Sequence, residues 1–333
     1  MHKTIGKNTP ILICGAGSIG ERHLNNLLSL GYENIMLYRT RNEPLRTVKK
    51  EFPVFLDLNE ALKKNPEISF ITNPTSLHIE TAINCARSGS HIFIEKPLSH
   101  NTEGIDKLKC VAEKSKIKVM VGYMMRFHPC IKEIKKIIDE KRIGNILSTM
   151  SVWGEYLPDW HPWEDYSTSY AAKKTMGGGP ALTLSHDLDL LVYFFGKPDR
   201  LKAFANYNSN LNIDTESSID IILKYKNGIV SSVHLDYLQK PPGREYLFIG
   251  DKGKAKFHYF ENKVEIHTDS SSETFTGPEG FERNDMFLEE VKYFINCIEN
   301  NINPSPGIDE AAISLNIALK AIESDKHEKG VKL

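Results

Sequence analysis

Up to about residue 122, short runs of hydrophobic positions alternate with amphipathic stretches. The runs are four or five residues long and mostly apolar on both faces: residues 11–14, 35–38, 68–72, 91–94 and 118–122. Strands that are buried on both sides show this pattern, and such strands belong to parallel sheets. The stretches between them have helical spacing, for example from Ser18 to a stop at Gly31 and over residues 77–88 before Gly89. The alternation predicts a doubly wound α/β domain.

After about residue 146 the pattern changes to strands with one covered face, at residues 148–153, 201–207, 218–226, 229–236, 245–249 and 254–258. Asn227-Gly228 predicts a type I′ hairpin, and residues 251–253 predict a second tight joint. Helices are expected over residues 181–195, 285–299 and 309–324, followed by a loosely held tail at residues 326–333. We therefore predict two domains, residues 1–125 and 126–333, the second of α+β type with a mainly antiparallel sheet.

Composition narrows the class of protein without naming an activity. The chain has 333 residues, 40% hydrophobic and 26% charged, with a formal net charge of -1. This balance predicts neither a nucleic acid nor a membrane partner. The polar residues 1–9 and the five cysteines, an odd number without close spacing, favour a cytoplasmic protein without a disulfide framework.

A glycine-rich turn joins the first predicted strand to the first predicted helix. Its residues are Gly15, Ala16, Gly17, Ser18, Ile19 and Gly20. Gly15 permits the tight turn, Gly17 allows close approach of a pyrophosphate, and Gly20 allows the helix to pack on the strand. The pyrophosphate is then held at the positive end of the helix. In this strand–turn–helix context the motif predicts dinucleotide binding.

The end of the second predicted strand bears on the choice of dinucleotide. Enzymes that use NAD usually carry an acidic residue there, but this strand ends in Arg39-Thr40-Arg41. A guanidinium favours a 2′-phosphate through charge-assisted hydrogen bonds, so Arg39 with Thr40 favours NADP over NAD. The alternative is that both arginines are solvated surface charges and the enzyme accepts either cofactor.

The fourth predicted strand ends in Glu95-Lys96-Pro97. Ligands of open α/β sheets bind beyond the carboxyl ends of the strands, so Lys96 is expected to face the cofactor crevice. An ammonium there can carry the proton of a substrate hydroxyl as a hydride leaves the same carbon. A lysine in an ordinary loop before proline is the alternative.

Five ordered motifs resemble the glucose–fructose oxidoreductase/inositol 2-dehydrogenase/MocA (Gfo/Idh/MocA) family. They are residues 15–20, the Asn73-Pro74-Thr75-Ser76-Leu77-His78 turn, Glu95-Lys96-Pro97, residues 121–129 with Arg126, and residues 177–189. The resemblance covers nearly the whole chain. It implies a Rossmann domain followed by a domain with a large, open, mostly antiparallel sheet.

The resemblance also implies roles for residues at matching positions. Lys96 would be catalytic, with a Lys-Pro bond that is often cis, and Glu95 would lie near the nicotinamide ribose. The turn with Asn73, Pro74, Thr75 and His78 would lie against the cofactor. His186 would contact the substrate oxygen.

The sequence departs from the family pattern before His186. Many members have an aspartate four residues earlier, where this chain has Leu182, with Thr183 one residue closer. The carboxylate is missing, or Asp187 or Asp189 plays a related part. From spacing alone, His186 and Asp189 share a helix face, and a structural histidine is the alternative to a proton relay.

Residues 153–166 contain all three tryptophans, mixed with carboxylates and a histidine. Aromatic faces with polar groups suit a sugar, so Tyr156 and Trp160 are candidate substrate contacts. Anchoring of the loop to the sheet, or a subunit contact, is the alternative. No complete set of metal ligands at a recognised spacing is visible, so no metal site is predicted. The amino-acid sequence of this segment resembles that of a family subgroup found near bacterial surface-sugar biosynthesis genes.

The sequence therefore predicts hydride transfer between NAD(P) and a carbinol or keto carbon of a sugar, nucleotide-sugar or cyclitol. Lys96 would be the main acid/base group and His186 its partner, in a pocket shaped by Arg126, Tyr156, Trp160, Thr183 and Asp189. The rival functions are an inactive cofactor-binding sensor or structural paralogue, and an enzyme that recycles a retained cofactor. The exposed sheet face and the resemblance predict a homodimer or homotetramer.

Overall fold

The computed structural model describes residues 4–40 and 44–333 and divides into two compact units. The first unit comprises Met1–Met124 with Arg283–Ala312, and the second comprises Met125–Glu282 with Ile313–Leu333. None of the described helices combines the length and the apolar character that crossing a bilayer requires.

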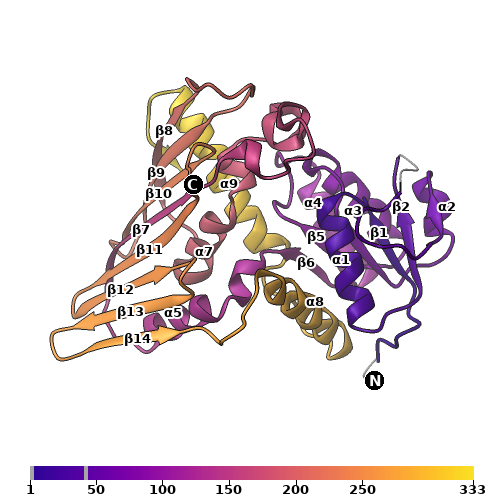
Figure 1. Ribbon diagram of the computed structural model, residues 1–333, viewed down its shortest axis with the longest axis horizontal. Helices are drawn as coiled ribbons and strands as arrows, with labels where there is room; N and C mark the ends of the chain where they lie inside the picture. The colour runs from indigo at the N-terminus through magenta and orange to yellow at the C-terminus, as the bar shows by residue number, and fades with distance from the viewer. Residues whose placement is uncertain (1–3, 41–43) are drawn as a thin grey trace. The chain divides into compact units, whose positions relative to one another are not determined.

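The first unit is built on a six-stranded sheet in which every neighbouring pair is parallel (Figure 1). The strand order is β3 (Val54–Phe55), β2 (Ile35–Tyr38), β1 (Ile11–Cys14), β4 (Ile68–Ile71), β5 (His91–Glu95) and β6 (Val119–Gly122). The connecting helices are α1 (Ser18–Ser29), α2 (Leu58–Leu62), α3 (His78–Arg87) and α4 (Ile105–Ser115), with the short turn η1 (Thr75–Leu77) before α3. Every residue of β1, β4 and β6 is buried, which confirms the doubly wound parallel sheet read from the apolar runs.

A segment from late in the sequence completes this unit, which differs from the predicted division at residue 125. Helix α8 (Arg283–Glu299) groups with the Rossmann sheet, and α9 (Ile308–Lys326) begins in the first unit and ends in the second. The reason is packing: Phe294 of α8 lies edge-on to Phe70 and Phe93, with ring centroids 6.5 and 5.8 Å away. Burial of aromatic surface against β4 and β5 outweighs proximity in sequence.

The second unit contains a nine-stranded mixed sheet in the order β14-β13-β12-β11-β7-β10-β9-β8-β15 (Figure 1). Its strands are β7 (Ile146–Gly154), β8 (Arg200–Asn206), β9 (Ser218–Lys224), β10 (Val230–Asp236), β11 (Gly243–Gly250), β12 (Gly253–His258), β13 (Lys263–Thr268), β14 (Ser272–Thr276) and β15 (Val331–Lys332). Only the β7–β10 pair is parallel among these described strands. The expected large, mostly antiparallel sheet is confirmed.

Helices cover one face of this sheet. They are α5 (Pro129–Asp139), α6 (Pro180–Thr183) and α7 (His186–Phe195). Short 3-10 turns lie between the longer elements: η2 (Met124–Phe127), η3 (Leu157–Asp159), η4 (Tyr166–Thr168), η5 (Tyr170–Ala172) and η6 (Lys174–Met176). Phe194 of α7 packs edge-on to Phe248 of β11 at 5.4 Å, which marks the buried face. The opposite face keeps large apolar side chains exposed, including Met150, Val152, Ile222 and Ile249.

Three local predictions for the second unit need correction. The hairpin at Asn227-Gly228 is present, but only Gly228 has a positive φ, so the turn is not type I′. The helix expected over residues 181–195 breaks at Leu184 and Ser185 into α6 and α7. The tail is not loose, because Val331 and Lys332 pair with Leu201 and Arg200 at the sheet edge. Edge pairing satisfies backbone groups that the local sequence does not reveal.

Candidate active site

The glycine turn has the geometry that a pyrophosphate site requires. Gly15 has φ +105°, and a Cβ there would lie 2.6–2.8 Å from backbone atoms of Thr72 and Asn73. A Cβ on Gly20 would lie 2.0 Å from the Gly15 carbonyl oxygen. These two glycines are therefore needed for the turn itself.

Gly17 differs from its two neighbouring glycines. A Cβ there would meet nothing within 4 Å, and its φ is an ordinary -77°. Gly17 is the N-cap of α1, and no side chain caps this helix end. Ser18 and Ile19 are its first residues, and Ala16 lies in the turn. Open space before uncapped N–H groups fits the pyrophosphate of a dinucleotide.

The turns that follow β1, β4 and β5 meet at one edge of the sheet, because these strands are neighbours and parallel. Thr72 donates from Oγ1 to the Gly15 carbonyl at 2.6 Å. Asn73 donates from Nδ2 to Thr81 at 2.8 Å, and Pro74 and Thr75 begin η1. This edge includes the reversal of strand order between β1 and β4, where open α/β sheets bind ligands.

His78 joins two of these turns. Its Nδ1 lies 2.9 Å from the Pro97 carbonyl oxygen and its Nε2 lies 2.9 Å from the Asn73 carbonyl oxygen. Burial lowers the pKa of His78, so the ring is neutral and donates one proton between the two acceptors. The side chain is buried and holds backbone in place, while its predicted contact with the cofactor stays a prediction.

The Glu-Lys-Pro turn lies directly after β5, and the Lys96–Pro97 bond is cis. One carboxylate oxygen of Glu95 accepts the Lys96 backbone N–H at 3.1 Å, and the other lies 2.6 Å from Nε2 of His23. Glu95 is therefore fixed from two sides and fixes the backbone of Lys96 in turn. The catalytic role of Lys96 and the ribose contact of Glu95 stay predictions.

Arg39 and Thr40 follow β2, as the sequence predicts, and Arg41 lies outside the described residues. A buried carboxylate from α1 organises the chain beyond them. Glu21 accepts the backbone N–H groups of Arg46 and Thr47, at 2.9 and 2.8 Å, and the Thr47 hydroxyl at 2.8 Å. This carboxylate is thus occupied by main-chain donors.

In the second unit, His186 is the first residue of α7 and is buried, with its ring centroid 5.8 Å from that of Trp153. Thr183, at the end of α6, donates to the Gly179 carbonyl at 2.9 Å and shares a hydrogen bond with the buried Tyr237 hydroxyl. A threonine–tyrosine hydroxyl pair thus stands in the segment where the resemblance would lead one to expect an aspartate.

The two aspartates offered as substitutes for that carboxylate lie in buried ion pairs. Asp189 accepts two hydrogen bonds from Arg126, both at 2.8 Å, and Asp187 accepts one from Arg244 at 2.7 Å. Arg244 also lies over the Trp153 ring, 3.8 Å from its centroid. The Arg126–Asp189 pair orients α7, and a direct contact of either residue with substrate stays a prediction.

The aromatic loop is attached to the sheet on one side. The half-buried Trp160 lies edge-on to Tyr237, with centroids 5.4 Å apart, and the Lys240 ammonium lies 3.5 Å from the centre of the Tyr156 ring. Trp163 is 61% exposed. Tyr156 and Trp160 therefore anchor the loop, while their contact with substrate is untested.

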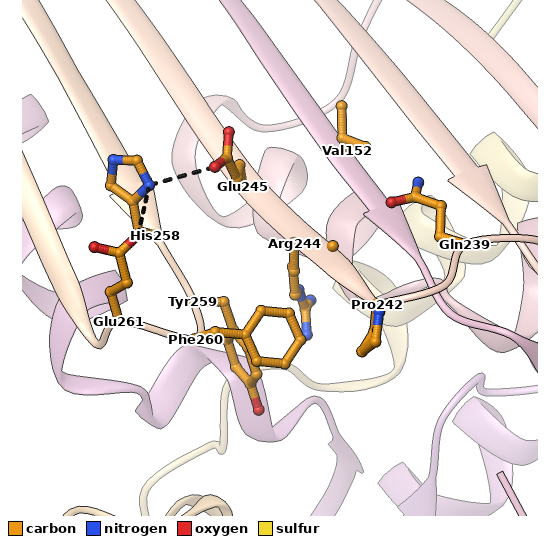
Figure 2. A pocket seen from close by; sticks show the side chains of 10 residues that line it. Val152, Gln239, Pro242, Arg244, Glu245, His258, Tyr259, Phe260 and Glu261 are labelled. Atoms are coloured by element: carbon orange, nitrogen blue, oxygen red, sulfur yellow. Dashed lines mark ion pairs between the residues drawn. The ribbon is translucent and has the colours of Figure 1, made fainter. Parts of the chain in front are cut away.

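A cavity of about 360 Å³ in the second unit lies beside the ends of β11 and β12 (Figure 2). Within it, Nδ1 of His258 lies 3.3 Å from Glu245 and 3.7 Å from Glu261. Phe260 is 62% exposed beside these charges. Arg244, the partner of Asp187, lines this cavity, whereas none of the predicted catalytic and substrate residues does.

Several residues of the site were missed by sequence reasoning. Tyr237 directly follows β10, Arg244 lies in β11, and neither belongs to a recognisable motif. His23 has the sequence context of an ordinary helix residue. The one available signal was for His23, which follows the glycine turn by three residues and shares a helix face with Gly20. Charged residues that pair across distant segments have no characteristic separation in the sequence, so the sequence alone does not reveal them.

Two family models match the chain in order. One, described as "Oxidoreductase family, NAD-binding Rossmann fold", covers residues 10–123, and the other, "GFO/IDH/MocA C-terminal domain", covers residues 131–256.

Named relatives extend the match beyond these two segments. Myo-inositol 2-dehydrogenase of Thermotoga maritima is 24% identical over 96% of this chain and 97% of its own length. Levoglucosan dehydrogenase of Pseudarthrobacter phenanthrenivorans is 34% identical over 62% of this chain and 61% of its own.

Solved structures share the whole fold. A structure of levoglucosan dehydrogenase in complex with NADH has a TM-score of 0.87 at 20% identity, covering 98% of this chain and 99% of the other. The dinucleotide turn, the two-unit architecture and the ordered family matches together show that the chain belongs to the Gfo/Idh/MocA family and is an NAD(P)-dependent oxidoreductase.

Proposed function

We propose that this protein transfers a hydride reversibly between NAD(P) and a carbinol or keto carbon of a sugar, nucleotide-sugar or cyclitol, with Lys96 as the acid/base group. The observation that carries the proposal is the position of Lys96. It follows β5 at the sheet edge where the turn with Gly17 offers open, uncapped N–H groups. A proton carrier and a dinucleotide site thus share one edge of one sheet.

The substrate class rests on the relatives and on the second unit. Two relatives are named for myo-inositol and levoglucosan, which are rich in hydroxyl groups. The loop with Tyr156 and Trp160 also carries Trp163, which is 61% exposed, and aromatic faces of this kind bind sugar rings. The likeness of this loop to a subgroup near bacterial surface-sugar genes supports nucleotide-sugars as the first substrates to test.

The glycine turn and the Asn73–Thr75 turn would hold NAD(P), which when bound supplies the hydride acceptor at nicotinamide C4. In the oxidative direction, the unprotonated amine of Lys96 takes the proton of the substrate hydroxyl as its carbon loses a hydride. The Glu95 carboxylate holds the Lys96 backbone and stabilises the ammonium that results. His186 is the proposed partner that contacts the substrate oxygen and passes the proton onward.

The proposal is tested with the purified protein and a screen of sugars, nucleotide-sugars and cyclitols, using both NAD and NADP. Lys96→Met removes the amine but keeps a similar shape, so turnover should fall by at least about 100-fold, the range of general acid–base catalysis. The affinity for cofactor should stay within about threefold, because the glycine turn is intact. Lys114→Met on α4, an exposed lysine, is the matched control. Unchanged turnover in Lys96→Met would exclude Lys96 as the acid/base group.

We further propose that Arg39 favours NADP. Arg39 and Thr40 follow β2, and the Glu21 carboxylate of α1 is occupied by the main-chain N–H groups of Arg46 and Thr47. Arg39→Gln removes the charge that would pair with a 2′-phosphate. We expect the ratio of kcat/KM for NADP to that for NAD to fall at least about tenfold, which corresponds to about 1.4 kcal/mol. An unchanged ratio would show that Arg39 is a solvated surface charge.

A further inference from the structure

Behind the Glu-Lys-Pro turn, three side chains from distant parts of the first unit form a buried cluster. They are His23 of α1, Glu95 of β5 and Glu290 of α8, and we call them the buried acid cluster. One nitrogen or oxygen atom of each lies within 4.8 Å of the others. His23 and Glu290 are fully buried and Glu95 is 5% exposed.

The cluster is enclosed by aromatic rings. The His23 ring lies 5.0 Å from Phe93, 5.4 Å from Phe70 and 6.0 Å from Phe287, centroid to centroid. Such surroundings offer no hydrogen bonds to a carboxylate. An ionised carboxylate without a partner is therefore strongly disfavoured there.

Glu290 is the member without a partner. Neither of its carboxyl oxygens has a hydrogen-bond partner among the described residues, whereas Glu95 is held by His23 and by the Lys96 N–H. Burial, and then the charge of Glu95, raise the pKa of Glu290 well above its ordinary value. Two carboxyl groups this close do not both ionise, and Glu290 is the one that keeps a proton.

A shared proton fits this geometry better than a metal ion does. His23 Nε2 and Glu95 Oε1 lie 2.6 Å apart, the distance of a short, charge-assisted hydrogen bond. Two atoms bound to one Zn²⁺ at about 2.1 Å each and at tetrahedral angles lie roughly 3.4 Å apart. The two atoms are too close to be ligands of one ion as they stand.

We propose that Glu290 is a positioning residue that stays protonated and, by a small shift of its side chain, donates that proton to the His23–Glu95 pair within 4.8 Å of it, thereby keeping Glu95 oriented behind Lys96. The inference rests on the proposed role of Lys96. Other charged groups near the cluster include Arg22, next to His23 in α1, whose pKa is lowered by burial and then by the charge of Arg283 at the start of α8. Lys96 follows Glu95 directly. The pKa of His78 in α3, which burial lowers, is also raised by the charge of Glu95 and lowered by the charge of Lys96.

The protonation of Glu290 is tested without any substrate, by melting temperature against pH. The native state holds a proton that the unfolded chain releases above the ordinary carboxyl range, so the contribution of Glu290 to wild-type stability should fall as pH rises. Glu290→Gln removes this dependence. The melting temperature of the variant minus that of wild type should therefore increase steadily from about pH 5 to about pH 8. Glu289→Gln on the exposed side of α8 is the control and should run parallel to wild type. Parallel curves for Glu290→Gln would overturn the protonated assignment.

The positioning role is tested by comparing Glu290→Gln with Glu290→Met. Glutamine keeps a donor toward Glu95 and should preserve the pH profile of kcat/KM, whereas methionine keeps the volume without a donor. We expect Glu290→Met to lower kcat/KM about tenfold or more, the effect of one lost charge-assisted hydrogen bond, and to move the pH midpoint. A methionine variant with the wild-type profile would reduce Glu290 to a structural role. If both variants lost the wild-type pH profile of kcat/KM, the proton would have to leave Glu290 during the reaction, which contradicts the proposal.

Two further measurements separate this inference from the proposed function. If no substrate is turned over, the pH dependence of Lys96 acylation, followed by peptide mass spectrometry, replaces kcat/KM as the readout. It should shift in Glu290→Met and not in Glu290→Gln, and equal profiles in all three proteins would overturn the inference. Addition of Zn²⁺ or Mn²⁺ should leave the wild-type melting temperature unchanged. Stabilisation by either ion that is lost in Glu290→Gln would replace the shared proton with a metal site.

Discussion

Gly17→Ala should separate cofactor binding from folding. An alanine at this position fits the folded protein, because φ is -77° and a Cβ would meet nothing within 4 Å. Replacing glycine where the backbone is unstrained stabilises by about 0.4–1 kcal/mol through the unfolded chain. The melting temperature should therefore stay the same or rise slightly.

Cofactor binding should respond in the opposite direction. The added methyl group occupies the open space before the N-terminus of α1, where the pyrophosphate must approach the backbone closely. Loss of one charge-assisted hydrogen bond costs about 1.5–3 kcal/mol, which corresponds to roughly 10- to 150-fold in Kd. Titration of NADH and NADPH by fluorescence or calorimetry, alongside a melting curve, measures both effects in one preparation.

Gly20→Ala provides the contrast, and Gly6→Ala the control. A Cβ on Gly20 would lie 2.0 Å from the Gly15 carbonyl oxygen and 3.0 Å from the Thr72 hydroxyl, so α1 must move away from β1. Overpacking of this kind costs about 1–3 kcal/mol or more, which lowers the melting temperature. A Cβ on Gly6 meets nothing within 4 Å, so Gly6→Ala should leave the cofactor affinity unchanged and should not lower the melting temperature. Wild-type affinity in Gly17→Ala would refute the pyrophosphate site, and a melting temperature as low as that of Gly20→Ala would refute the open space.

Three further predictions concern the second unit. Asp189→Asn leaves the buried Arg126 guanidinium without its charge partner, and should cost about 3–5 kcal/mol in chemical denaturation; a cost under about 1 kcal/mol would contradict the buried pair. Burial raises the pKa of Glu216 to about 7 from 4.5, so its contribution to stability is complete below about pH 4.5 and is lost as pH rises through 7. Glu216→Gln should therefore gain up to about 3 kcal/mol on wild type by pH 8, from 2.5 pH units at 1.36 kcal/mol each, and no gain would show an ordinary carboxyl group. If the exposed sheet face joins subunits, Met150→Lys with Ile222→Lys should lower the mass measured by light scattering to that of one chain, since both side chains are 45% exposed in the single chain. An unchanged mass would place any subunit contact elsewhere.

Local patterns predicted the first unit well for a physical reason. Strands such as β1 and β4 are buried on both faces, so their apolar runs are continuous and bounded by turn residues. The glycine turn is local too, since one strand, one turn and one helix contain all of its requirements. The second sheet was read less completely, because β13 and β14 lie toward an edge and only partly alternate.

The sequence by itself determined the dinucleotide turn, the Glu-Lys-Pro turn, the two sheet types and, through its ordered motifs, the family. Only the tertiary structure decided which polar groups face one another. It paired Asp187 and Asp189 with arginines, placed the hydroxyls of Thr183 and Tyr237 together, and brought Glu290 from late in the chain against Glu95. A turn is specified by neighbours along the chain, whereas a buried charge is stabilised by whichever partner packing brings within a few ångströms, and that partner leaves no mark in local spacing.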